Sequence, residues 1–164
     1  MIDAVSAAMA MHPNKEGMTT AFAGTADAAG SDTGRGPDAA PGRRIAIVED
    51  ELMVAWSLES MAEDLGHYVV GIYASGEAAL AGIGDMPPDL VLMDINLGGG
   101  IDGIETARRL RHGSSVAILF ISAYADRETR DRALGAVPDA MLLGKPVPTV
   151  ALAKAIAAAT SPLD

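Results

Sequence analysis

The sequence predicts an α/β protein in which five parallel strands form one doubly wound sheet with helices on both faces. Two patterns within residues 43–164 carry this prediction. Short apolar runs alternate with helix-like segments, which is typical of βαβ units and a parallel sheet. The runs are also continuously apolar, as expected of strands that are covered on both faces. The chain has 164 residues, about the length of one domain.

The expected strands are short and rich in aliphatic residues, and a helix-like segment follows each. We expect strands at residues 45–48, 68–72, 90–93, 116–121 and 140–143. We expect helices at residues 51–65, 76–84, 103–112, 125–135 and 148–160. In the first helix a buried stripe is predicted, because apolar residues recur at spacings of 4, 3 and 4, at Val54, Leu58, Met61 and Leu65.

Four residues mark helix ends. Asp50 is expected to cap the first helix, and Gly66 is a suitable residue to end it. Asp102 precedes the third helix, and Pro148 lies near the first turn of the last helix, where a missing N–H costs little.

Composition sets the N-terminal segment apart and limits the function. Residues 1–42 are rich in Ala and Gly and contain no Leu, which predicts a disordered tail before a folded domain at 43–164. The net charge of −10 disfavours binding to nucleic acid or to anionic membranes. The absence of Cys excludes disulfides and thiolate metal sites. We see no secretion signal and no long apolar stretch, and we expect a cytoplasmic protein.

Charged and polar residues follow four of the expected strands. They are Glu49 and Asp50 after the first, Asp94 after the third, Ser122 after the fourth and Lys145 after the fifth. Each alone suits a turn or a helix cap. In a doubly wound sheet, however, these positions share the edge at which ligands bind, so their joint placement indicates a site.

The chemistry of this set points to phosphoryl transfer. Glu49, Asp50 and Asp94 would crowd three carboxylates together, which demands a cation. With oxygen ligands alone, Mg²⁺ suits the site best. Lys145 can pair with Asp94 or with a phosphoryl oxygen, and Ser122 offers a hydroxyl donor. Asp94 is the natural nucleophile for an aspartyl phosphate.

Residues 43–160 resemble the receiver domain of bacterial two-component response regulators, a CheY-like (flavodoxin-like) fold. The segments that carry the resemblance are Ile47–Glu51, Pro88–Asp94, Phe120–Ser122 and Lys145-Pro146. The resemblance implies that Asp94 accepts a phosphoryl group from a histidine kinase.

The same resemblance implies a role for each site residue. Mg²⁺ would be held by Glu49, Asp50, Asp94 and the backbone carbonyl of Asn96. Lys145 would contact the phosphoryl group, its bond to Pro146 would be cis, and Ser122 would move toward the phosphoryl group as a switch.

Two departures narrow the resemblance. Leu142 stands where many receivers carry a switch aromatic, whereas Tyr124 follows Ser122 by two residues. This arrangement, with the Gly-rich loop Gly98–Gly103, is similar to a Phe-Ala-Thr-Gly-type receiver subgroup that is common in alphaproteobacteria and includes general-stress anti-anti-sigma regulators. Tyr124 is either a substitute switch residue or a packing residue at a helix start.

We therefore expect a single-domain response regulator, not an enzyme, without an output domain and with no DNA or membrane partner. It would relay phosphate between a histidine kinase and a histidine phosphotransfer protein, or regulate another protein target. A pseudo-receiver that binds partners without phosphate is the main alternative. A haloacid-dehalogenase-like phosphatase is disfavoured because Asn96 stands where a general acid is needed. A flavodoxin-type carrier is disfavoured because Glu49 and Asp50 would repel its phosphate.

Overall fold

A five-stranded parallel sheet is the centre of the computed structural model, which describes residues 42–84, 87–124 and 126–160. The predicted tail, apart from Gly42, lies outside the described residues. Strands and helices alternate as β1 (Arg44–Val48), α1 (Leu52–Asp64), β2 (Tyr68–Tyr73), α2 (Gly76–Gly82), β3 (Leu90–Asp94), α3 (Gly103–His112), β4 (Ala117–Ser122), α4 (Arg127–Ala136), β5 (Met141–Gly144) and α5 (Thr149–Ala159). This order confirms the predicted (βα)5 arrangement.

The strand order in the sheet is β2-β1-β3-β4-β5, and all neighbouring strands run parallel. The chain moves outward from β1 in one direction to β2 and in the other to β3. Such a reversal opens a crevice at the carboxyl ends of the central strands, which is where open α/β sheets bind ligands. The topology therefore assigns the site to the ends of β1 and β3.

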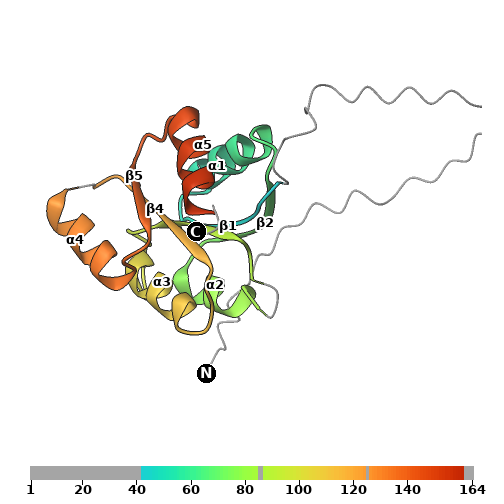
Figure 1. Ribbon diagram of the computed structural model, residues 1–164. Coiled ribbons are helices and arrows are strands. Elements are labelled where there is room, and N and C mark those ends of the chain that lie inside the picture. The colour runs from blue at the N-terminus through green and yellow to red at the C-terminus, as the bar shows by residue number, and fades with distance from the viewer. Residues whose placement is uncertain (1–41, 85–86, 125, 161–164) are drawn as a thin grey trace, which may run out of the picture.

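Two helical layers cover the sheet, with α1 and α5 on one face and α2 and α3 on the other (Figure 1). Successive residues of a strand point to opposite faces. In β1, Ile45 and Ile47 join the apolar cluster under α1 and α5, whereas Ala46 and Val48 join the cluster shared with α2, α3 and α4. Continuous apolar runs are therefore needed to fill both cores, as predicted.

The edge strands differ from the expectation of burial on both faces. The residues of β1 and β3 are almost all buried, but β2 and β5 are mainly half-buried. The physical reason is their position, because an edge strand has a neighbour on one side only.

The first helix packs through smaller residues than its periodicity suggested. Of the predicted stripe only Leu58 is buried, while the other three residues are half-buried. Ala55 and Ala62 are fully buried. Small side chains let the helix backbone approach the sheet closely, and the larger residues then flank the contact.

Helix caps were predicted with mixed success. Asp102 caps α3 by accepting a hydrogen bond from Glu105 N–H at 2.8 Å. Gly66 ends the first helix with a φ of 82°. Pro148 is the residue at the N-cap of α5. The prediction for Asp50 is wrong, because Glu51 occupies the N-cap of α1 and Asp50 instead accepts a hydrogen bond from Gly98.

Within the described ranges, no helix is long and apolar enough to cross a membrane.

Candidate functional site

The predicted site residues converge at the carboxyl edge of the sheet. Glu49, Asp94 and Ser122 are buried there, at the ends of β1, β3 and β4. Lys145 directly follows β5, and a hydrogen bond from its N–H to the Ser122 carbonyl continues the ladder between β4 and β5. The sheet therefore brings together side chains from positions 49 to 145 of the chain.

Lys145 is the positive centre of this cluster. Its Nζ donates to Glu49 Oε2 at 2.7 Å and to Asp94 Oδ2 at 3.1 Å. The peptide bond between Lys145 and Pro146 is cis, as the family resemblance implied. One ammonium thus joins the carboxylates at the ends of β1 and β3.

Burial and charge shift the acid–base behaviour of this pair. Removal from water raises the pKa of the Glu49 carboxyl, and the nearby Asp94 charge raises it further, against the lowering effect of Lys145. Burial lowers the pKa of the Lys145 ammonium, but its hydrogen bonds to Glu49 and Asp94 outweigh burial, so this pKa lies above its ordinary value. The lysine therefore stays charged beside the carboxylates at neutral pH.

The three acidic residues form a group that suits a divalent cation. One carboxylate oxygen from each of Glu49, Asp50 and Asp94 lies within 4.8 Å of the others. Lys145 supplies one positive charge against these three carboxylates, so a further cation would balance the group. Oxygen donors of this kind match Mg²⁺, and receiver domains generally bind Mg²⁺ at an acidic cluster.

Backbone N–H groups also orient each carboxylate. Asn96 N–H donates to Asp94 Oδ1 at 3.1 Å, and Glu51 N–H donates to Glu49 Oε1 at 3.2 Å. Asp50 Oδ2 accepts from Gly98 N–H at 3.0 Å. The loop after β3 therefore holds two of the three acidic residues, and it carries Asn96 beside Asp94.

Ser122 lies at the site but is bonded to its own loop. Its hydroxyl donates to the Tyr124 carbonyl and accepts from Tyr124 N–H, both at 3.1 Å. Tyr124 is 68% exposed, which does not favour a packing role for it. At the position where other receivers carry an aromatic, Leu142 packs half-buried against the core under α3 and α4.

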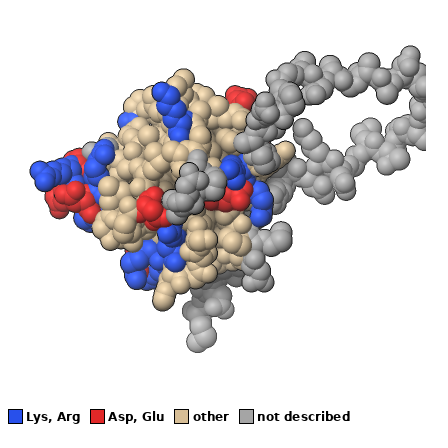
Figure 2. Space-filling model, viewed as in Figure 1, with Lys and Arg blue, Asp and Glu red and all other residues tan. Residues whose placement is uncertain are grey.

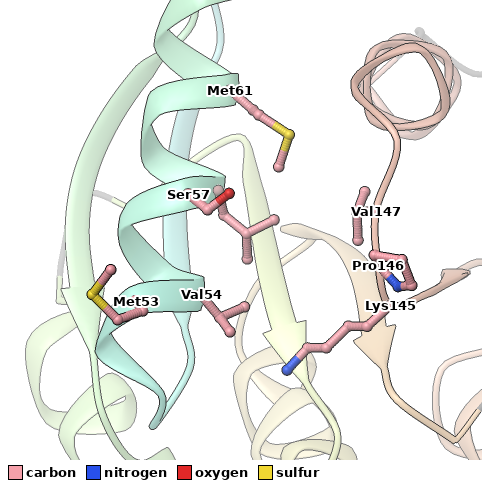
Figure 3. A pocket seen from close by; sticks show the side chains of 8 residues that line it. Met53, Val54, Ser57, Met61, Lys145, Pro146 and Val147 are labelled. Carbon is pink, nitrogen blue, oxygen red and sulfur yellow. The ribbon is translucent and has the colours of Figure 1, made fainter.

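A groove of about 530 Å³ lies beside the cluster, between α1 and the segment after β5. Figure 3 shows the Lys145 side chain crossing its end, with the ammonium directed toward the first turn of α1. The groove is lined by Met53, Val54, Ser57, Leu58, Met61, Lys145, Pro146 and Val147. Met53 and Ser57 fall outside the predicted stripe of α1, so the apolar periodicity gave no sign of this groove.

The surface over α4 is strongly charged, with acidic and basic side chains close together (Figure 2). Within α4, Arg127 Nε lies 3.6 Å from Asp131 Oδ2. Arg132 Nη2, also in α4, lies 3.2 Å from Oδ2 of Asp102 at the start of α3. In the face shown, basic side chains are interspersed with acidic ones and do not merge into one basic patch.

The fold and this cluster define a receiver domain, and the comparisons with known proteins agree. The family described as response regulator receiver domain matches residues 45–157. The chain therefore belongs to the response regulator receiver family, as the resemblance predicted. Receiver domains act in signalling, through kinases and protein targets.

Two curated relatives and one solved structure show which members of this family the chain is similar to. The chain is 37% identical over 84 residues to the phyllosphere-induced regulator PhyR of Methylorubrum extorquens, covering 51% of this chain and 32% of PhyR. It is 33% identical over 124 residues to the transcriptional regulatory protein PdtaR of Mycobacterium tuberculosis, covering 76% of this chain and 60% of PdtaR. It also resembles the structure of a mutant anti-anti-sigma factor PhyR from Bartonella quintana, with a TM-score of 0.60, 26% identity, and 73% and 48% of the two chains covered.

The two PhyR matches confirm the predicted similarity to receivers of anti-anti-sigma regulators. The chain spans about a third of the length of the first relative and 60% of the second.

Proposed function

We propose that the chain is a phosphoacceptor receiver of a two-component system, in which Asp94 takes a phosphoryl group from a histidine kinase. The observation that carries the proposal is the contact of one half-buried ammonium with two buried carboxylates, from Lys145 Nζ to Asp94 Oδ2 at 3.1 Å and to Glu49 Oε2 at 2.7 Å. The arrangement supplies a nucleophile and a fixed positive charge at one point, as phosphoryl transfer requires.

In the proposed step, an Asp94 carboxylate oxygen forms a bond to phosphorus and the phosphorus–nitrogen bond of the kinase phosphohistidine breaks. The imidazole leaves with the bonding electrons, and Asp94 becomes an acyl phosphate. The Lys145 ammonium turns from the carboxylate to a phosphoryl oxygen and balances its charge. Asn96 N–H keeps the carboxylate oriented through Oδ1.

The cation site belongs to the same proposal. Glu49, Asp50, Asp94 and the backbone carbonyl of Asn96 would hold Mg²⁺. When bound, Mg²⁺ would neutralise charge on the phosphoryl oxygens. The chain's own contribution is the carboxylate cluster, in which the three ligand oxygens already lie within 4.8 Å of one another.

We further propose that Ser122 is the switch. Its buried hydroxyl would leave the Tyr124 backbone and bond to a phosphoryl oxygen, which frees the segment between β4 and α4 to move with Tyr124. The changed surface would then bind a protein partner in the cytoplasm. That partner is a histidine phosphotransfer protein or another protein target, and the name of the anti-anti-sigma factor PhyR supports a protein target.

The test exposes the full chain to acetyl phosphate in the presence of Mg²⁺ and measures its mass, with Asp94→Asn as the matched variant. We expect one phosphoryl group per chain, which is lost without Mg²⁺ and in Asp94→Asn. Beryllofluoride should change the amide chemical shifts of the wild type and leave those of Asp94→Asn unchanged.

Two other outcomes would contradict the proposal. A wild-type chain that neither gains mass nor responds to beryllofluoride is a pseudo-receiver. Steady hydrolysis of many phosphate esters would instead indicate a phosphatase, for which Asn96 provides no general acid.

A further inference from the structure

The Gly-rich loop between β3 and α3 connects the proposed cation site to α2. Gly99 and Gly100 have φ angles of 72° and 71°, in the left-handed region that glycine tolerates best. Three successive glycines make a loop costly to order, because glycine loses the most conformational freedom on folding. The loop therefore needs contacts that fix its course.

Two carboxylates hold this loop through its backbone. Asp50 Oδ2 accepts from Gly98 N–H at 3.0 Å, and Glu77 Oε1 accepts from Ile101 N–H at 2.9 Å. The two acceptors come from the end of β1 and from the first turn of α2, so the loop bridges two separate parts of the fold. Hydrogen bonding to the Ile101 N–H lowers the pKa of the Glu77 carboxyl below its usual value, as expected when the charged form is the acceptor.

The packing around the glycines shows that both contacts are close. A Cβ atom on Gly98 would lie 2.8 Å from Asp50 Oδ2, and a Cβ atom on Gly100 would collide with the Glu77 carboxylate. Gly76, beside Glu77, likewise lets the first turn of α2 pack against the Ile101 side chain. Glu77 therefore lies directly against the loop backbone.

Asp50 depends on this loop more than the other two acidic residues do. Glu49 and Asp94 are buried and bonded to Lys145, whereas Asp50 is exposed. Among the described residues, the only hydrogen bond to the Asp50 side chain comes from Gly98 N–H. A free surface carboxylate samples several rotamers, so one fixed donor reduces the entropy that ligand binding must remove.

We propose that Glu77 is a positioning residue for the cation site, acting through Ile101 and Gly98 to orient Asp50. This inference rests on the proposed Mg²⁺ binding and deepens it. Glu77 itself does not touch the cation. It fixes the far end of the loop, the fixed loop presents Gly98 N–H, and that donor holds the Asp50 carboxylate in place for the ion.

The experiment measures Mg²⁺ dissociation constants of the full chain from amide chemical shifts during titration with magnesium chloride alone. Glu77→Ala should weaken Mg²⁺ binding about three- to tenfold, the effect of one lost hydrogen bond. Glu77→Gln keeps an acceptor oxygen and should bind Mg²⁺ almost as the wild type does. Glu128→Ala removes the same charge from the first turn of α4 and should leave the affinity unchanged.

A second variant tests the same contact without a change of charge. Gly100→Ala should displace the Glu77 carboxylate and also strain a backbone whose φ is 71°, so it should weaken Mg²⁺ binding at least as much as Glu77→Ala does. The double variant should bind Mg²⁺ little more weakly than Gly100→Ala alone, because the Glu77 contact is already lost in Gly100→Ala. Without Mg²⁺, hydrogen exchange at Gly98 N–H should speed up in Glu77→Ala and stay slow in Glu77→Gln.

The outcomes separate this inference from the proposed function. Equal weakening in Glu77→Gln and Glu77→Ala would assign the effect to charge and overturn the positioning role. Unchanged affinity in Glu77→Ala would overturn it as well, while leaving the phosphoacceptor proposal intact. If the wild type binds no Mg²⁺, or binds it equally well as Asp50→Asn, the cation site itself is wrong and both proposals fall.

Discussion

The Lys145 ammonium lies 2.7 Å from the Glu49 carboxylate, 96 positions away in the sequence. This bond joins the ends of β1 and β5, which are not neighbours in the sheet. Only 16% of the Lys145 side chain and 1% of the Glu49 side chain are exposed. The pair is thus largely withdrawn from water, and each partner makes the burial of the other tolerable.

Replacing Lys145 should therefore cost stability as well as signalling. Lys145→Met keeps an apolar stem but leaves Glu49 and Asp94 without their shared donor, so the unfolding free energy should fall by about 1–3 kcal/mol. Urea denaturation measures this change. Lys154→Met, on the exposed side of α5, is the matched control and should change stability by less than about 0.5 kcal/mol. If both variants are equally stable, the pair contributes nothing to the fold.

Gly103 should be intolerant of any side chain, because a Cβ atom there would collide with the Asp94 carbonyl. Gly103→Ala must shift α3 away from β3, at a cost of about 1–3 kcal/mol or more. It should also slow phosphorylation by acetyl phosphate, since the displaced backbone carries Asp94. Gly135→Ala, in α4 with open space at the Cβ position, should stabilise the chain by about 0.5–1 kcal/mol. Equal stability of these two variants would contradict the packing.

The ion pairs of Glu105 should make the free energy of unfolding depend on pH. Its carboxylate accepts from Arg108 Nε at 2.8 Å and from Arg109 Nε at 2.6 Å, which lowers its pKa from 4.5 to about 2. A lowered carboxyl pKa stabilises the folded state above pH 4.5, and this contribution is lost as the pH falls toward 2.

Urea denaturation of the wild type and Glu105→Gln across this range tests the effect. The wild type should be more stable at neutral pH, and the difference should shrink between pH 4.5 and pH 2. High salt should also shrink it, because exposed ion pairs are screened. A difference that is constant with pH would show that the arginines do not act on Glu105.

The sequence predicted the sheet and the buried part of the site because both follow from periodic patterns. Continuous apolar runs define the strands, and parallel strands end at one edge, so Glu49, Asp94 and Lys145 had to lie close together. The family resemblance added their roles and the cis bond before Pro146.

The remaining features depend on side-chain geometry that no pattern encodes. Asp50 stands at a sequence position typical of a helix cap, but its carboxylate accepts a hydrogen bond from Gly98 N–H in the Gly-rich loop and does not cap α1. Glu77 gave no signal in the sequence, because its partner, Ile101, lies 24 positions away. Ser122 was correctly placed, but its bond to the Tyr124 backbone depends on how the loop turns after β4.

Loss of the Ser122 hydroxyl should leave phosphorylation of Asp94 intact but abolish the conformational change that follows it. Ser122 is fully buried and bonded twice to the Tyr124 backbone, so its hydroxyl is the group at this site that can exchange a loop contact for a phosphoryl contact. Ser122→Ala should still accept a phosphoryl group on Asp94, because neither Lys145 nor the acidic cluster is altered. The segment from residue 126 to residue 147 should no longer change conformation when Asp94 is phosphorylated, because residue 122 then has no hydroxyl to bond to the phosphoryl group.

Hydrogen exchange of this segment, with and without beryllofluoride in Mg²⁺, measures the response. We expect a change in protection in the wild type and none in Ser122→Ala. Ser114→Ala is the control for a lost hydroxyl, because Ser114 Oγ bonds to the Leu110 carbonyl away from the site, and its response should match the wild type. An undiminished response in Ser122→Ala would assign the switch to another group at the end of β4, and the exposed Tyr124 ring would then be the first residue to test.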